Sequence, residues 1–243
     1  MSKIIECERM IDRSRKFTEF FEPYKALREI RFLVLHHIEA NSLNHAIEQL
    51  VSHGVSSHFI IDETGNIFEL VDENDVAYHA GVSYWNGCEG LNKHSIGVEF
   101  INSDAFGKDF EKLQLEAGVS LCKYIAAKYD IKPENIVGHS DIAYDKETGF
   151  LDRKQDPSHL FDWKFFADNG ISQYDGVLDN ILAGVKLDEL QLGVKSDAIQ
   201  SIKQKLSSFG YKILNLDDKY DLELQHILSV FNRRFASRNN GNA

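Results

Sequence analysis

The chain has few of the residues that mark several specialised protein classes. Its 243 residues include only three cysteines and three prolines. The cysteines, at Cys7, Cys88 and Cys122, are odd in number and far apart, which excludes a disulfide framework and a paired-cysteine zinc knuckle. Positive charge is also scarce, since Lys and Arg number 27 against 38 Asp and Glu, a net charge of −11. So acidic a chain is a poor ligand for nucleic acid, and we expect no nucleic-acid partner.

Long apolar runs are missing as well. No stretch approaches the roughly 18 apolar residues that a membrane helix needs, so we expect no transmembrane segment. The first residues, Met1 to Cys7, hold no apolar stretch of signal-peptide length, which favours a cytoplasmic location. Hydrophobic residues make up 43% and charged residues 27% of the chain, the ordinary globular range.

Periodicity divides the chain into a mixed first part and a helical last part. We expect a large domain at residues 1–175, a linker at 176–192 with one short helix, and a small all-helical domain at 193–243. The helices of the small domain carry too few apolar residues for a core of their own, so we expect it to pack against the large domain.

The large domain alternates strand-like and helix-like segments. Strands are predicted at 31–38, 57–62, 66–71, 95–101 and 136–139, and helices at 44–53 and 109–129. Residues 1–28 are expected to be a peripheral lead-in with some helix. The fold class is therefore α/β, with a mixed central sheet flanked by helices. The apolar stripe expected on helix 109–129 consists of Phe110, Leu113, Ala117, Leu121 and Ile125.

Two histidines and one carboxylate could form a metal site. His36 lies within a buried strand, His139 leaves the end of another strand, and Asp156 follows in a loop. Two imidazoles and a carboxylate with an open fourth position suit catalytic zinc. Spacing alone leaves the alternative of hydrogen-bonded core histidines open, because ten histidines offer several such triples. His37 points to the opposite face of the strand.

Glu99 strengthens the case for a catalytic site. It alternates with apolar neighbours on its strand, so we expect it to face a pocket, where a carboxylate can take the proton of a metal-activated water.

Six motifs in order resemble the zinc-dependent N-acetylmuramoyl-L-alanine amidases of the Amidase_2 family. The resemblance is greatest to the AmiD and AmpD types, extends to the peptidoglycan recognition proteins, and covers about residues 30–170. The motifs are Val34-Leu-His36, Ser56-Ser-His-Phe-Ile-Ile-Asp62, Ala77-Tyr-His-Ala-Gly81, Ser95-Ile-Gly-Val-Glu99, Gly138-His-Ser-Asp-Ile-Ala143 and Arg153-Lys-Gln-Asp-Pro157.

The resemblance implies roles for individual residues. His36, His139 and Asp156 would bind Zn²⁺, while Glu99 and Lys154 would be catalytic. Further residues of the family pattern are expected to line the cleft or contact substrate, namely His58, His79, Trp85, Asn92 and His159.

The implied reaction is hydrolysis of the amide between N-acetylmuramic acid and L-alanine, in peptidoglycan or muropeptides. Two alternatives remain open: a recognition module that binds peptidoglycan without cutting it, and a zinc peptidase acting within the stem peptide. The small domain is similar to helical peptidoglycan-binding domains, and this likeness makes the cell envelope the alternative to the cytoplasm. Residues 144–152 depart from the family pattern as a longer loop, expected to reshape one wall of the cleft.

Overall fold

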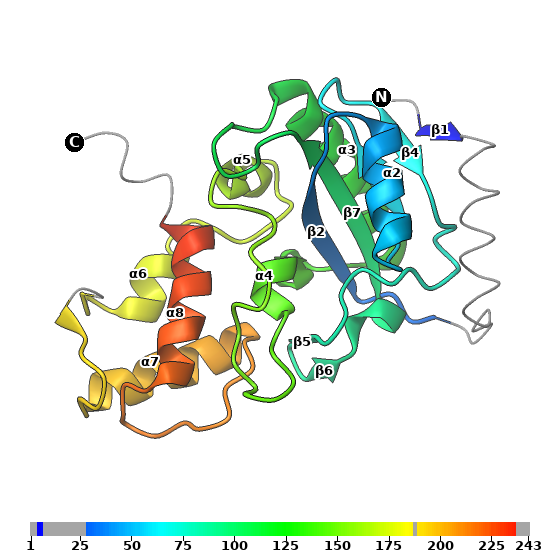
Figure 1. Ribbon diagram of the computed structural model, residues 1–243. Helices are drawn as coiled ribbons and strands as arrows, with labels where there is room; N and C mark the ends of the chain where they lie inside the picture. The colour runs from blue at the N-terminus through cyan, green and yellow to red at the C-terminus, as the bar shows by residue number, and fades with distance from the viewer. Residues whose placement is uncertain (1–3, 7–27, 187–188, 237–243) are drawn as a thin grey trace.

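A mixed six-stranded sheet forms the centre of the molecule in the computed structural model, which describes residues 4–6, 28–186 and 189–236 (Figure 1). The strand order is β1-β4-β3-β7-β2-β8, and of these pairs only β3–β4 is antiparallel. The strands are β1 (Ile4–Glu6), β2 (Phe32–Glu39), β3 (Phe59–Ile61), β4 (Ile67–Glu69), β7 (Ser95–Asn102) and β8 (Ile136–Gly138). The mixed sheet is confirmed. Of the expected lead-in at 1–28, the structure describes only Arg28 and β1, a strand that was not predicted.

Helices cover both faces of the sheet. On one face, α2 (Leu43–Ser52) buries Ile47 and Leu50 against Ile60 and Ile101. On the other face, α3 (Lys112–Tyr129) contacts β2, β3 and α5 (Trp163–Asp168). The short elements between these are β5 (Tyr84–Trp85), β6 (Cys88–Glu89), η1 (Leu91–His94), η2 (Pro133–Asn135) and α4 (His139–Ile142).

The stripe predicted for α3 is partly wrong. Leu113 is 62% exposed, whereas the neighbouring Gln114 is fully buried. The Gln114 amide donates hydrogen bonds to the backbone oxygens of Ile61 and Ile101, at 2.9 and 2.8 Å. A polar side chain therefore joins α3 to two strands, an arrangement that hydrophobic periodicity does not predict.

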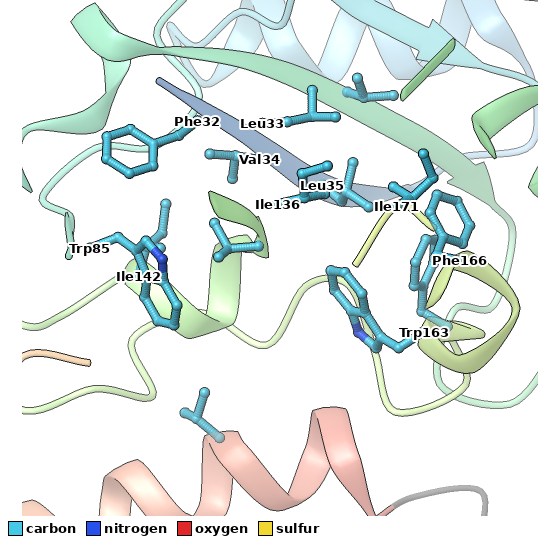
Figure 2. Close-up of a cluster of buried hydrophobic side chains, with 14 of the residues drawn as sticks. Phe32, Leu33, Val34, Leu35, Trp85, Ile136, Ile142, Trp163, Phe166 and Ile171 are labelled. Atoms are coloured by element: carbon cyan, nitrogen blue, oxygen red, sulfur yellow. The ribbon is translucent and has the colours of Figure 1, made fainter. Parts of the chain in front are cut away.

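The C-terminal helices pack against the sheet domain. They are α6 (Val177–Leu182), α7 (Asp197–Phe209) and α8 (Leu222–Phe235). Their buried residues belong to the same hydrophobic cluster as those of β2 and α3. Figure 2 shows Trp85, Ile142 and Trp163 between β2 and the red helix α8. The expected packing of this region against the large domain is confirmed.

Within the described ranges, no helix is both long and apolar enough to cross a membrane.

Candidate metal centre and cleft

Three potential metal ligands converge at one point beside the sheet. The Nδ1 atoms of His36 and His139 each lie 3.0 Å from Oδ2 of Asp156. One potential ligand atom from each of the three residues lies within 4.8 Å of the other two. Two imidazoles and a carboxylate, leaving one position open, match the donor set of catalytic zinc sites.

The sheet topology explains why these residues meet. His36 lies on β2, and His139 directly follows the parallel neighbouring strand β8 as the first residue of α4. The carboxyl ends of adjacent parallel strands share one edge of a sheet, where open α/β folds commonly place their sites. The Ser140 backbone N–H donates to the Asp156 backbone oxygen at 2.7 Å, which holds the third ligand against this turn.

A relay of hydrogen bonds assigns the tautomer of His36. The Ser95 hydroxyl donates to the Leu91 oxygen at 2.7 Å, so its Oγ accepts from Nε2 of His79 at 3.2 Å. Nδ1 of the neutral His79 then accepts from Nε2 of His36 at 3.0 Å. The Nδ1 lone pair of His36 is thereby left facing Asp156 and His139, as a metal ligand requires.

His139 is oriented in the same way. Its Nε2 donates to the Ala80 backbone oxygen at 3.2 Å, which leaves Nδ1 as the ligand atom. Asn92 holds this segment, because its side-chain oxygen accepts from the backbone N–H groups of His79 and Ala80, at 3.0 and 2.7 Å. Gly97 makes room for His79, whose ring would lie 2.5 Å from an added Cβ.

The site favours a neutral His36 and an ionised Asp156. Burial lowers the pKa of His36 to about 4, with a further contribution from the nearby His139. Burial raises the pKa of Asp156, but His139 and His36 outweigh it and hold that pKa well below its ordinary value. These are the protonation states in which His36 and Asp156 bind a cation.

Glu99 lies next to the ligands on β7, where it is the register partner of His36. Its Oε1 is 4.0 Å from Nδ1 of His36, and its Oε2 is buried with no hydrogen-bond partner among the described residues. Burial, and then the charge of Asp156, raise its pKa well above the ordinary value. An unsatisfied carboxyl with a raised pKa beside a donor set suits a general acid or base.

These residues share a cavity of about 540 Å³. Lys154 is exposed at its wall, and its charge lowers the pKa of Glu99. His79 and Asn92, expected at the cleft, line it as well. The structure therefore brings together all five residues expected to bind metal or catalyse.

The other three expected substrate contacts lie outside the cavity lining. His58 is fully buried, accepts from the Gly97 backbone N–H at 3.0 Å, and has its pKa lowered to about 3 by burial and by Arg28. Trp85 is fully buried against Tyr211, with ring centroids 4.9 Å apart. His159 is exposed beside Phe106.

The loop at 144–152 faces the C-terminal helices. None of its residues, all of which the structure describes, lines the cavity. Phe150 lies 5.4 Å from the His226 ring, and Asp152 pairs with Arg233 at 2.8 Å. Its side chains bind α8, and its Tyr144 backbone oxygen accepts from Nε of Arg153, which lines the cavity, at 3.1 Å. The expectation that this loop reshapes the cleft wall stays a prediction.

Sequence reasoning missed two charged residues near the site. The Arg28 guanidinium donates to the backbone oxygens of Glu73 and Ser95, at 2.8 and 2.7 Å, and so joins the segments that surround His58. Asp141 stands within a recognised motif but was given no role, although it binds Arg234. No local pattern marks either residue, because their partners are distant in sequence.

Comparison with known proteins gives one family. Residues 26–159 match the family Amidase_2, described as N-acetylmuramoyl-L-alanine amidase. The chain is 36% identical over 163 residues to the N-acetylmuramoyl-L-alanine amidase AmiD of Escherichia coli, covering 61% of this chain and 56% of AmiD. It is 36% identical over 112 residues to the 1,6-anhydro-N-acetylmuramyl-L-alanine amidase AmpD of Salmonella typhimurium, covering 46% of this chain and 55% of AmpD. The chain thus spans about half the length of these curated relatives.

Solved structures extend the likeness beyond the segment matched by the family. Escherichia coli AmiD, in complex with anhydro-N-acetylmuramic acid-L-Ala-D-gamma-Glu-L-Lys, is 30% identical with a TM-score of 0.67, covering 88% of this chain and 83% of that one. AmpDh3 of Pseudomonas aeruginosa, in complex with anhydromuramic pentapeptide, is 31% identical with a TM-score of 0.68, covering 89% and 87%.

Proposed function

Since this chain belongs to the N-acetylmuramoyl-L-alanine amidase family Amidase_2, we propose that it hydrolyses the amide between N-acetylmuramic acid and L-alanine. The observation that carries the proposal is the convergence of His36, His139, Asp156 and Glu99 in one cavity. AmiD and AmpDh3 bind anhydro-muropeptides, and a substrate of this class is proposed here too.

The metal is proposed to be zinc, held by His36, His139 and Asp156. The donor set, the two assigned Nδ1 lone pairs and the unpartnered Oε2 of Glu99 all fit such an ion. When bound, zinc supplies Lewis acidity and a lowered pKa for coordinated water.

Glu99 is proposed as the general base. Its buried carboxylate accepts the proton of the attacking water and then passes it to the amine of L-alanine as the amide bond breaks. Its raised pKa suits both steps. The Glu99 carboxylate is then a stronger base toward the water, and the carboxylic acid that results is still acidic enough to protonate the amine.

Lys154 is proposed to stabilise the negative charge that develops on the substrate carbonyl oxygen. It lies at the cavity wall, where a positive charge can stabilise the developing oxyanion. His79 is proposed to orient His36 through their hydrogen bond rather than to contact substrate directly.

The domain layout is part of the proposal. Residues 1–175 would form the catalytic unit, 176–192 a linker, and 193–243 a peptidoglycan-binding-like region. A chain that ends near residue 175 is expected to lose more activity on polymeric wall than on small muropeptides, which need only the cavity.

The direct test is incubation of the zinc-loaded chain with anhydro-muropeptides and with intact sacculi, side by side. Release of the intact stem peptide, abolished by a chelator and restored by zinc, is the expected result. Binding without product would indicate a recognition module, and a shortened stem would indicate a peptidase.

A further inference from the structure

The C-terminal helices reach the turn that carries a proposed metal ligand. Asp141 on α4 is fully buried, and its Oδ2 lies 2.6 Å from Nη1 of Arg234 on α8. The Tyr211 hydroxyl, just beyond α7, donates to Oδ1 of Asp141 at 2.9 Å. Figure 1 shows α4 between the sheet and α8. Both oxygens of this carboxylate are therefore bound by the C-terminal region.

The position of Asp141 is tied to the backbone around His139. Oδ2 of Asp141 also accepts from the Gly138 backbone N–H at 2.8 Å, immediately before the ligand. Helix α4 is a single turn of four residues, too short to be stable without outside contacts. Ser140, which follows His139, donates its backbone N–H to the Asp156 backbone oxygen at 2.7 Å. A displacement of Asp141 would therefore move two of the three ligands.

Arg234 and Tyr211 are held rigidly enough to set that position. The Arg234 guanidinium lies 4.2 Å from the Trp163 ring centroid and donates to the Ile136 backbone oxygen at 3.1 Å. Tyr211 is 1% exposed and packs edge-on against Trp85. Charge-assisted hydrogen bonds from such preorganised donors are short and directional.

We infer that Arg234 and Tyr211 are positioning residues of the metal centre, acting on His139 through Asp141. The C-terminal region would then complete the catalytic site from outside the cavity, whatever it does toward the wall. This inference rests on the proposed function for the identity of the metal, but its test needs no substrate.

The test compares metal binding by Arg234→Met, Arg234→Lys and Tyr211→Phe with that of the natural chain. Zinc affinity is measured by competition with a chromogenic chelator, and ligand geometry by the visible spectrum of the cobalt-loaded protein. Arg234→Met is expected to bind zinc about 10-fold or more weakly, as for other groups that orient metal ligands, and to alter the cobalt spectrum. Arg234→Lys keeps the charge but not the planar fork that stacks on Trp163, so it should recover only part of the affinity.

Lys203→Met is the matched control. Lys203 is a buried cation of α7, paired with Asp217 and Asp221 at 2.8 and 2.7 Å, so its loss also destabilises the C-terminal region. Both ion-pair partners lie within the C-terminal region rather than on α4, so zinc affinity and the cobalt spectrum should stay unchanged.

A purely structural role would give a different result. If Arg234→Met lowers stability like Lys203→Met but keeps the natural zinc affinity and cobalt spectrum, the inference is overturned. If Arg234→Met does not fold, Tyr211→Phe decides, because it removes one hydroxyl and leaves the ion pair. An altered cobalt spectrum in that variant supports the inference, and an unchanged one contradicts it. Absence of amidase activity in the natural chain would instead count against the proposed function alone.

Discussion

Two buried carboxyl groups close to the metal ligands, Glu99 beside His36 and Asp141 two residues after His139, differ in their hydrogen bonds. Glu99 is 7% exposed and leaves one oxygen without a hydrogen-bond partner among the described residues. Asp141 is 1% exposed and binds the Gly138 N–H, the Tyr211 hydroxyl and Arg234. Similar burial therefore gives one carboxyl with a raised pKa and one in a closed network of hydrogen bonds.

The difference distinguishes a carboxyl group that can react, Glu99, from one that holds its neighbours in place, Asp141. An unpaired buried charge is costly, and it persists where a proton has to move. A buried carboxylate whose two oxygens both accept hydrogen bonds resists movement, and loss of either partner of its ion pair is strongly destabilising. We therefore assign proton transfer to Glu99 and positioning to Asp141.

The largest effect is expected when one of the three proposed metal ligands is removed. His139→Ala should weaken zinc binding by more than the roughly 100-fold that groups orienting a ligand can contribute, and turnover should be lost with the metal. His45→Ala is the matched control, because His45 is exposed on α2 and outside the cavity lining, whereas His37, expected on the opposite face of the strand, lines the cavity. Elemental analysis and activity check both variants, and a His139→Ala protein that kept its zinc would refute the ligand assignment.

Replacement of Glu99 tests whether this carboxyl group transfers the proton. Glu99→Gln should keep zinc and lose about 10²–10⁴-fold in kcat, with little change in KM, because the group acts on water rather than on resting substrate. Glu73→Gln is the control, since Glu73 is a buried glutamate already paired with Lys128 at 3.0 Å. A raised KM with near-normal kcat would make Glu99 a binding residue.

Stability should respond to the two carboxyls in opposite directions. Asp141→Asn is expected to lower the free energy of unfolding by about 3–5 kcal/mol, because it leaves Arg234 buried and unpaired. Glu99→Gln should leave stability equal or raise it, since it removes an unsatisfied acid. Urea denaturation of the metal-free proteins measures both, and equal losses would remove the distinction between the two groups.

A smaller effect on stability is expected at acidic pH, because the buried His58 resists protonation in the folded chain. The pKa of His58 is about 3 in the folded chain and 6.5 in the unfolded reference, so the unfolded chain binds more protons between these values. The stability that His58 contributes should therefore be complete above about pH 6.5 and fall as pH decreases, by about 2 kcal/mol at pH 5. His58→Gln should reduce this slope in urea denaturation of metal-free protein, and an unchanged slope would exclude His58 as its source.

Local patterns predicted the parts of the molecule that local chemistry determines. Alternation along β7 placed Glu99 on the face opposite Ile96 and Val98, and strand burial located His36. Contacts between distant segments were beyond such patterns. Trp85 was expected at the substrate, but it packs against Tyr211, far along the chain. Pairing of Asp141 with Arg234 joins residues 93 positions apart, and neither carries a periodic signal.

The most direct measurement of the central claim is hydrolysis of an anhydro-muropeptide in heavy-oxygen water, followed by mass analysis of both products. Cleavage of the amide to L-alanine puts one heavy oxygen into the lactyl carboxylate of the sugar and none into the stem peptide. The account predicts this result for the zinc-loaded chain, with the labelled product formed about 10²–10⁴-fold more slowly by Glu99→Gln. A heavy oxygen in the stem peptide, or in neither product, would contradict it.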